Sequence, residues 1–368
     1  MKQSITAAVI ALFLASSAQA VMPLTMAEGM DKNGDGHITT EEYALYYDLD
    51  FDRRDRGDDG ILTSKEFTNK NLFRQGDRNQ DGQLTRDEFQ AIYTRRFAQY
   101  DINQDGLIAG AEIERVPGCV TQTVVYSIRD GKELTLDIDL PSGEGPFPVV
   151  VWVHGGGWTS GDSSALVEFS QRMTLQGIAG VRINYRLANA TDAAKVEDAL
   201  SDVLTSIDWV RANAETYHFD MQRLGIGGAS AGGHLSALAA QRTPECIAYV
   251  GYCGGYDILN RGNSSWPSAG LLHRFLGGSD AMTLKANSAI WKIRQSPAET
   301  LLLHGTADKI IDPDISVRFA EALHSQGGEV KLVLLEGASH GICHQSEYKQ
   351  QCLAESEAFL CRVFGKAP

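Results

Sequence analysis

The chain has 368 residues and a formal net charge of −14 at pH 7, and 43% of its residues are hydrophobic. This length predicts two domains rather than one. The acidic balance argues against binding to nucleic acids or anionic membranes, because both carry negative charge. After the first twenty residues, no stretch is long and apolar enough to cross a membrane, so we expect no membrane span.

Residues 1–20 have the pattern of a secretory signal peptide. Lys2 precedes an apolar run from Ile5 to Ala15, and Ala18-Gln19-Ala20 is typical of a signal-peptidase site. The apolar run is too short for a spanning helix. We therefore expect cleavage after Ala20 and a secreted or periplasmic mature protein. An uncleaved anchor is the alternative.

An acidic repeat of about two dozen residues follows, between residues 28 and 115. Asp31–Glu42 and Asp77–Glu88 have the residue types of a twelve-residue EF-hand calcium loop, with oxygen ligands, a glycine at position 6 and a closing glutamate. Asp101–Glu112 also fits, with Ala109 at position 9. Asp55–Glu66 is degenerate because Gly57 replaces the ligand at position 3, so we expect weaker binding or an extra water there.

The predicted ligands include position 7, which contributes its backbone carbonyl. They are Asp31, Asn33, Asp35, His37 and Glu42 in the first loop, Asp55, Asp59 and Glu66 in the second, Asp77, Asn79, Asp81, Gln83 and Glu88 in the third, and Asp101, Asn103, Asp105, Leu107 and Glu112 in the fourth. Because the loops are close in sequence, each exit helix is expected to serve as the next entry helix.

The apolar faces of these helices are expected to form a small core, from Tyr43, Leu45, Tyr46, Phe67, Leu72, Phe73, Phe89, Ile92, Tyr93 and Phe97. A core of this size is marginal, so Ca²⁺ should contribute to folding. We expect a structural role for this calcium and none in catalysis.

From Val116 onward, strand-like and helix-like segments alternate, which predicts a mostly parallel α/β sheet in a domain at 116–368, after an all-α EF-hand module at 21–115. The eight candidate strands are Val120–Tyr126, Leu134–Leu140, Pro148–Val153, Gly180–Asn184, Arg223–Gly227, Ala248–Cys253, Thr300–Leu303 and Lys331–Leu335. The candidate helices are Ser164–Gln176, Ala193–Ala214, Gly233–Arg242, Ile315–Gln326 and Ser346–Phe364.

The sequence Gly228-Ala229-Ser230-Ala231-Gly232 lies between the fifth strand and a helix, which is the context of a nucleophile elbow. An elbow after the fifth of eight strands predicts an α/β-hydrolase fold. The loop His154–Trp158 contains three glycines and directly follows a strand. The backbone N–H groups of Gly156, Gly157 and Ala231 are therefore predicted to form an oxyanion hole. We expect His154 to be a scaffold residue, whereas Trp158 either lines the site or packs.

The predicted base and acid follow the last two strands. His340 would take the proton of Ser230, and Asp308 would orient His340. Weaker candidates are Asp312 and Asp257 for the acid and His344 for the base. The remaining histidines are expected at the surface or in packing roles, namely His218, His234, His273 and His324.

Six cysteines in an exported chain permit disulfides. Cys352 and Cys361 lie nine residues apart on one predicted helix, roughly 13 Å along its axis, so they are not expected to pair. Cys343 with Cys352 and Cys246 with Cys253 are candidate short-range pairs.

From about Val124 to the end, the chain resembles the α/β-hydrolase esterases of the hormone-sensitive-lipase-like type, and most of all the secreted bacterial feruloyl and acetyl-xylan esterase branch. The matching motifs are His154–Trp158, Asn184–Leu187, Gly228–Leu235, Leu303–Asp308 and Gly337–Gly341. The resemblance implies a serine carboxylesterase. The chain differs from the lipase-like members in two respects. EF-hands occupy the place of an N-terminal lid, and the stretch Asn260–Asn287 is polar and glycine-rich.

An uncovered site would suit acetyl or feruloyl esters on a polysaccharide or oligosaccharide. Two alternatives remain at this point. One is an amidase, formamidase or peptidase that uses the same three residues. The other is a calcium-dependent binding or scaffold protein with a catalytically silent hydrolase body.

Overall fold

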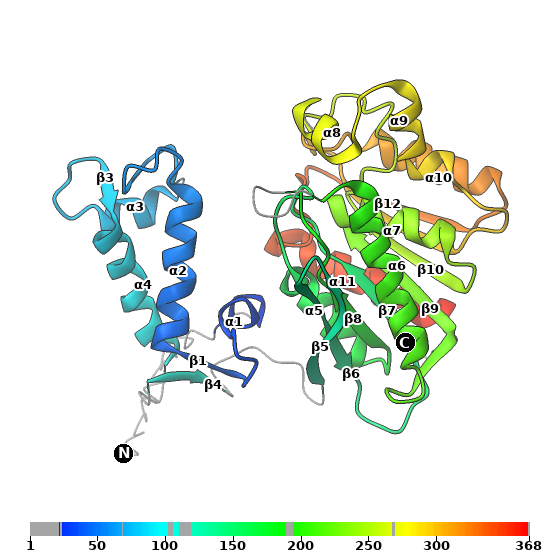
Figure 1. The fold of residues 1–368 in the computed structure, drawn as a ribbon, viewed down its shortest axis with the longest axis horizontal. Coiled ribbons are helices and arrows are strands. Elements are labelled where there is room, and N and C mark those ends of the chain that lie inside the picture. Colours follow the sequence, from blue (N-terminus) through cyan, green and yellow to red (C-terminus); the bar gives the residue numbers. More distant parts are fainter. Residues whose placement is uncertain are drawn as a thin grey trace, which may run out of the picture. The chain divides into compact units, whose positions relative to one another are not determined.

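A computed structural model describes residues 22, 24–67, 69–101, 106–109, 119–188, 194–266 and 269–366 (Figure 1). The chain divides into two compact units, Met1–Glu114 and Arg115–Pro368. The predicted signal peptide lies outside the described residues, as do the predicted ligands Asn103, Asp105 and Glu112. Within the described part of the chain, none of the helices combines the length and apolar character that a membrane crossing requires.

The first unit consists of short helices joined by calcium-type loops. Its elements are α1 (Leu24–Met30), β1 (His37–Thr39), α2 (Thr40–Arg54), β2 (Ile61–Thr63), α3 (Lys70–Gly76), β3 (Gln83–Thr85), α4 (Arg86–Tyr100) and β4 (Leu107–Ala109). Helix α2 leaves the first loop and ends where the second begins, and α4 links the third loop to the fourth in the same way. These two exit helices therefore serve as entry helices, whereas the helix that enters the third loop, α3, begins only at Lys70, four residues after Glu66 closes the second loop.

The closing glutamates of the loops also cap these helices. Thr39 is the N-cap of α2, and its hydroxyl oxygen accepts from the Glu42 N–H while the Glu42 carboxylate accepts from the Thr39 N–H. Thr85 and Glu88 repeat this capping box at the start of α4. Because such a box satisfies two otherwise unpaired N–H groups, the same residues that close the loops also start the helices.

The short strands pair the loops in an unexpected order. β1 pairs antiparallel with β4, with Ile38 opposite Ile108, and β2 pairs antiparallel with β3, with Leu62 opposite Leu84. The first loop is therefore the partner of the fourth, and the degenerate second loop is the partner of the third. A continuous helix separates the first loop from the second, so these neighbours in sequence are not partners.

Aromatic side chains on α2 and α4 form the core of this unit. Tyr43, Tyr47 and Phe51 recur every fourth residue on α2 and are buried. The Tyr47 ring stacks on Tyr93 of α4, with ring centroids 3.5 Å apart. The prediction that Leu45 belongs to this core is wrong: Leu45 is 50% exposed, because it lies on the opposite face of α2.

The second unit is a three-layer α/β structure around one eight-stranded sheet (Figure 1). The strands are β5 (Val120–Arg129), β6 (Lys132–Leu140), β7 (Phe147–Val153), β8 (Ala179–Ile183), β9 (Phe219–Ala229), β10 (Cys246–Tyr252), β11 (Glu299–Gly305) and β12 (Val330–Leu335), in spatial order β12-β11-β10-β9-β7-β8-β6-β5. Only the β5–β6 and β6–β8 pairs are antiparallel. All eight predicted strands are present, and the fold is an α/β-hydrolase fold.

Both faces of the sheet are covered, which explains the unbroken apolar runs of its central strands. Along β7, Val149, Val151 and Val153 enter one core, and Val150 and Trp152 enter the other. Successive strand residues point to opposite faces, so a strand covered on both sides needs apolar residues throughout.

The helices that cover the sheet match the predicted ones closely. They are η2 (Ser163–Leu166), α5 (Val167–Thr174), α6 (Val196–Ala212), α7 (Ala231–Arg242), α10 (Asp314–Ser325) and α11 (Ser346–Val363). Helices α6, α7 and α10 contribute to one core, and α5 and α11 contribute to the other. The predicted helix Ser164–Gln176 begins as the 3₁₀ turn η2.

The polar, glycine-rich stretch before β11 also contains regular structure. It forms α8 (Ala269–Leu276), α9 (Ala281–Ala286) and the 3₁₀ turn η3 (Ala289–Trp291). Leu272, Phe275 and Leu284 from this stretch are buried in the core shared with α6 and α7. Glycines and polar residues interrupt the apolar pattern of this stretch, so its helices were not predicted.

All six cysteines carry free thiols in the structure. The predicted Cys246–Cys253 pair is wrong, because the two residues lie at opposite ends of β10, roughly 23 Å apart at the rise of a parallel strand. Cys352 and Cys361 both lie on α11 and are unpaired, as expected. Cys343 and Cys352 are buried in the same core but are not bonded to each other.

Candidate active site

Ser230 lies at the turn between β9 and α7 with a strained backbone. Its φ is 55° and its ψ is −117°, outside the regions that residues with side chains normally occupy. The Ser230 N–H donates to the carbonyl oxygen of Tyr252 over 2.8 Å, which ties the turn to the end of β10. The surrounding sheet therefore holds the turn in place.

The glycines that flank this serine are required by close backbone contacts. A Cβ on Gly228 would lie 2.5 Å from the carbonyl oxygen of Gly232. A Cβ on Gly232 would lie 2.1 Å from the carbonyl oxygen of Val153. Any side chain at these positions would push α7 away from β9 or β7, which is the physical reason for the Gly-x-Ser-x-Gly pattern.

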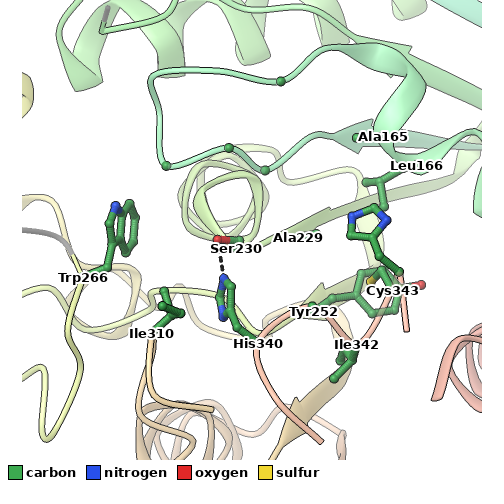
Figure 2. A pocket seen from close by; sticks show the side chains of 16 residues that line it. Ala165, Leu166, Ala229, Ser230, Tyr252, Trp266, Ile310, His340, Ile342 and Cys343 are labelled. Atoms are coloured by element: carbon green, nitrogen blue, oxygen red, sulfur yellow. Dashed lines mark hydrogen bonds between the residues drawn. The ribbon is translucent and has the colours of Figure 1, made fainter. Parts of the chain in front are cut away.

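The structure brings together Ser230, His340 and Asp308 from three separate loops, and Figure 2 shows the hydrogen bond between the first two. Ser230 Oγ lies 2.8 Å from His340 Nε2, and His340 Nδ1 lies 2.7 Å from Asp308 Oδ2. His340 follows β12, and Asp308 follows β11. This arrangement allows His340 to accept the serine proton while Asp308 stabilises the resulting imidazolium.

The surroundings of Asp308 favour its ionised form. Burial by itself would raise the pKa of this carboxyl group, but hydrogen bonds from His304 and His340 outweigh burial and hold the pKa well below its usual range. The N–H groups of Ile310 and Ile311 also donate to Oδ1, over 2.8 and 3.0 Å. Asp308 therefore carries a negative charge throughout the neutral range.

The alternative acids and base are engaged elsewhere or lie further from the serine. Asp257 forms an ion pair with Arg318, and Asp312 accepts from the N–H groups of Asn263 and Asp314. His344 lines the same cavity as Ser230, but the imidazole hydrogen-bonded to Ser230 belongs to His340.

The glycine loop after β7 lies against the nucleophile turn. A Cβ on Gly155 would be 3.0 Å from the carbonyl oxygen of Ala229 and 3.3 Å from Ser230 Cβ. Gly156 and Gly157 both have positive φ, 111° and 64°, which L residues rarely adopt. Together with Ala231 at the start of α7, these predicted oxyanion-hole residues therefore lie beside Ser230.

The two other prominent residues of this loop have supporting roles. His154 is buried and stacks on Tyr185, with ring centroids 4.3 Å apart, as expected of a scaffold residue. Trp158 is fully buried and stacks on Phe275 at 4.4 Å. The structure thus decides between the two interpretations of Trp158 in favour of packing.

A mostly apolar cavity of about 510 Å³ surrounds Ser230. Its walls are formed by Gly155, Gly156, Gly157, Gly161, Ala165, Leu166, Ala229, Ser230, Tyr252, Trp266, Ile310, His340, Gly341, Ile342, Cys343 and His344. Figure 2 shows Trp266 and Ile310 on one side of the serine, and Leu166, Tyr252 and Ile342 on the other. The cavity therefore offers space on both sides of an ester bond at Ser230.

Sequence reasoning missed several residues at this site. Trp266 forms a wall of the cavity, and its backbone N–H donates to the carbonyl oxygen of Ile310 over 3.1 Å. His304 contacts Asp308 directly, with Nε2 3.0 Å from Oδ2. The motif Leu303–Asp308 contains His304, and its position four residues before Asp308 was the signal in the sequence that could have identified it.

In the first unit, the three calcium-type loops whose ends are described share one hydrogen-bond pattern. The first carboxylate accepts from the N–H of the position-6 glycine, at Asp31, Asp55 and Asp77. The closing glutamate accepts from the N–H groups of positions 2 and 9, at Glu42, Glu66 and Glu88. The degenerate second loop therefore has the backbone form of the complete ones.

The chemistry of these loops suits Ca²⁺. Backbone hydrogen bonds from Thr63 and Thr85 lower the pKa values of Glu66 and Glu88 and keep them ionised. Ionised carboxylates are the hard oxygen donors that Ca²⁺ prefers. In the fourth loop, the described part retains the Asp101 carboxylate bonded to the Gly106 N–H.

Two family models match the chain. One, described as BD-FAE, matches residues 136–323, and the other, described as EF hand, matches residues 30–44 and 68–93. The first covers the glycine loop, the nucleophile turn and Asp308. The second covers the whole of the first loop and the whole of the third.

The curated relatives are named as esterases. Esterase LipC of Mycobacterium tuberculosis is 30% identical over 53% of this chain and 53% of its own length. A probable isoprenylcysteine alpha-carbonyl methylesterase of Arabidopsis thaliana, ICMEL1, is 28% identical over 60% of this chain and 51% of its own length. The chain therefore spans about half the length of these relatives.

Solved structures match over nearly their whole length. The propionate-bound esterase Est2 of Thermogutta terrifontis is 27% identical, with a TM-score of 0.59 over 68% of this chain and 97% of that chain. The same esterase phosphonylated by sarin has a TM-score of 0.61 at 26% identity, over 69% of this chain and 98% of that chain.

Acid should destabilise the protein through His234, next to the nucleophile turn. Burial lowers the pKa of this imidazole to about 4, and its Nε2 lies 2.7 Å from the carbonyl oxygen of Asn287. In the unfolded chain the pKa is about 6.5, so between these values only the unfolded state binds the proton. The free energy of unfolding should thus fall by about 3 kcal/mol as the pH drops through this window, and level off below it.

Urea unfolding between pH 4 and 7 checks this expectation when the native chain is compared with His234→Gln. The variant should lose much of the acid dependence, whereas other histidines contribute equally to both proteins. If the free energy of unfolding depends on pH equally in the two proteins, the assignment to His234 is contradicted.

Proposed function

The chain belongs to the BD-FAE family, its second unit is an α/β-hydrolase related to esterases, and from this premise we propose that it is a serine carboxylesterase. The observation that carries the proposal is the continuous hydrogen-bonded path from Ser230 Oγ through His340 to Asp308, over 2.8 and 2.7 Å. This path opens into an apolar cavity beneath a glycine loop.

In the first half of the reaction, Ser230 Oγ attacks the ester carbonyl carbon while His340 Nε2 takes its proton. The carbonyl oxygen becomes negative, and the N–H groups of Gly156, Gly157 and Ala231 stabilise it. Losing one such donor typically raises the barrier by about 3–4 kcal/mol. His340 then passes the proton to the alkoxy oxygen, the carbon–oxygen bond breaks, and the alcohol leaves.

The second half repeats these steps with water. His340 removes a proton from a water molecule, whose oxygen attacks the acyl-enzyme carbonyl carbon. The tetrahedral intermediate collapses, Ser230 Oγ regains the proton from His340, and the free carboxylic acid departs. Throughout, the Asp308 carboxylate stabilises the transient positive charge on His340.

For the substrate, we propose acetyl or feruloyl esters on polysaccharides or oligosaccharides. The cavity volume of about 510 Å³ lies in the range of pockets that hold drug-sized ligands, far more than an acetyl group fills. The aromatic side chains of Tyr252 and Trp266 in the cavity suit a planar aromatic acid. Both features favour feruloyl over acetyl.

For the first unit, we propose that Ca²⁺ binds the loops and stabilises this unit without taking part in the chemistry. The EF-hand match and the ionised, hydrogen-bonded carboxylates support calcium binding. We also propose export from the cytoplasm, which the leader-like residues 1–20 support.

Replacing Ser230 with alanine should reduce hydrolysis of p-nitrophenyl acetate by a factor of about 10⁶, the loss typical of a catalytic serine. A fluorophosphonate probe should label the native chain at Ser230 and leave Ser230→Ala unlabelled. The related Est2 is phosphonylated by sarin, which makes this class of probe a sound choice. Near-native turnover by the variant would refute the proposal, and turnover of only formyl-amides or peptides would favour an amidase or peptidase.

Enlarging the acyl group should increase kcat/KM. With p-nitrophenol as the constant alcohol, we expect ferulate and butyrate esters to exceed acetate, because one further buried methylene is worth about tenfold or more. Ala165→Trp should fill part of the cavity and lower the ferulate-to-acetate ratio, whereas the same substitution at the exposed Ala212 should not. If kcat/KM of the native chain falls as the acyl group becomes larger, the feruloyl preference is contradicted.

Removing calcium should lower the unfolding temperature of the first unit and leave most ester turnover intact. A ligand present at about 100 times its Kd stabilises the folded state by about 2.7 kcal/mol, which chelation would remove. Calorimetry with and without EGTA measures this, with Asp77→Asn as the ligand variant and Asp87→Asn as the charge-matched control. Immediate and complete loss of turnover on chelation would overturn the structural role.

A further inference from the structure

The carboxylate of Asp308 accepts hydrogen bonds from two backbone N–H groups and two side chains, and one of these side chains has no part in acyl transfer. Oδ1 accepts from two backbone N–H groups, and Oδ2 accepts from His340 over 2.7 Å. The fourth donor is His304 Nε2, 3.0 Å from Oδ2. His304 lies on β11 and is fully buried, so it touches neither solvent nor the cavity around Ser230.

The contacts of His304 determine where its hydrogen lies. Nε2 faces two acceptors, Asp308 Oδ2 and the carbonyl oxygen of Ile311, each 3.0 Å away. Neither oxygen can donate, so Nε2 carries the hydrogen. Nδ1 lies 2.6 Å from Ser316 Oγ, whose hydroxyl can donate to it. A ring with one hydrogen, on Nε2, satisfies all of these contacts.

Such a donor has a geometrical task at this position. The torsion that rotates a carboxylate about its Cβ–Cγ bond is broad and weakly restrained. The backbone N–H groups of residues 310 and 311 hold Oδ1. A second restraint on Oδ2 is needed to keep that oxygen in line with His340 Nδ1, and His304 supplies it from the adjacent strand end.

We propose that His304 is a positioning residue of the hydrolytic site, which holds Asp308 Oδ2 in the orientation that His340 requires. The proposal rests on the catalytic roles proposed above for Ser230, His340 and Asp308. Its own content is separate, because it concerns how the acid is oriented and how readily the Asp308–His340 pair takes up a proton.

One other side chain, the thiol of Cys253, also faces Asp308 and interacts with it. Cys253, at the end of β10, lies close enough that its sulfur and ligand atoms of His304 and Asp308 are within 4.8 Å of one another. Burial raises the pKa of the Cys253 thiol well above its usual range, so it stays uncharged. These three residues could also suit a soft divalent ion, but Nε2 must then lose the hydrogen that its two acceptors require.

Two substitutions of similar size separate positioning from packing. In His304→Gln the amide N–H group can reach the place of Nε2 and donate to Asp308. In His304→Asn the amide lies near the place of Nδ1, and Asp308 loses this donor. Leu323→Ala serves as the stability control, because it truncates a buried side chain near the end of α10, whereas the His304 partner Ser316 lies near the start of that helix.

We expect His304→Asn to lower kcat about 10- to 100-fold with little change in KM, the effect of losing one hydrogen bond to a charged group. The acid limb of its kcat/KM profile should move to higher pH, because a carboxylate with fewer donors holds protons more strongly. His304→Gln should recover most of kcat and the native acid limb. Leu323→Ala should lower the unfolding temperature without moving the limb.

A second readout does not depend on turnover. The His340 Nδ1 proton, hydrogen-bonded to Asp308, should give a downfield proton NMR signal that titrates at higher pH in His304→Asn than in the native chain. If the native chain is active and His304→Asn matches it in kcat, acid limb and NMR titration, the positioning role is wrong and the esterase proposal stands. If the native chain neither turns over esters nor reacts with a fluorophosphonate, the esterase proposal fails. The NMR comparison then decides the role of His304, and equal titrations would overturn it.

Discussion

The close contact between the nucleophile turn and the end of β7 is the constraint on which the catalytic unit depends. Helix α7 can begin where it does only because Gly232 leaves room for the carbonyl oxygen of Val153. That contact places Ser230 beside the glycine loop, while hydrogen bonding to Tyr252 fixes the turn to β10. Since β11 and β12 continue the same parallel sheet, their loops deliver Asp308 and His340 to the same edge.

Much of this arrangement could be predicted from the sequence, for identifiable physical reasons. Strands buried on both faces need unbroken apolar runs, so segments such as 147–153 stand out. A strained turn and a close backbone approach both require glycine, so the motifs around Ser230 and Gly156 can be recognised in the sequence from their glycine spacing. The set of Ser230, His340 and Asp308 followed from the glycine-flanked serine and from the positions of the acid and base directly after strands.

Other features depend on contacts that a linear pattern does not contain. The pairing of Leu62 with Leu84, and of Ile38 with Ile108, is set by how α2 and α4 pack, and any two of the loops look equally compatible in sequence. The helices α8 and α9 are hidden by glycines and polar residues. His304 gains its significance from Ser316 and Ile311, which only the folded chain brings to it.

The strand pairing of the first unit makes its four loops a nested set, with an inner pair enclosed by an outer one. In a tandem arrangement, one pair of loops could be lost or duplicated while the rest kept their partners. In a nested arrangement, removing either terminal loop leaves the loop at the far end of the module unpaired, and inserting one loop shifts partners on both sides. A module of this kind can therefore shorten without leaving a loop unpaired only by losing a matched set, either its first and last loops together or its two inner loops together.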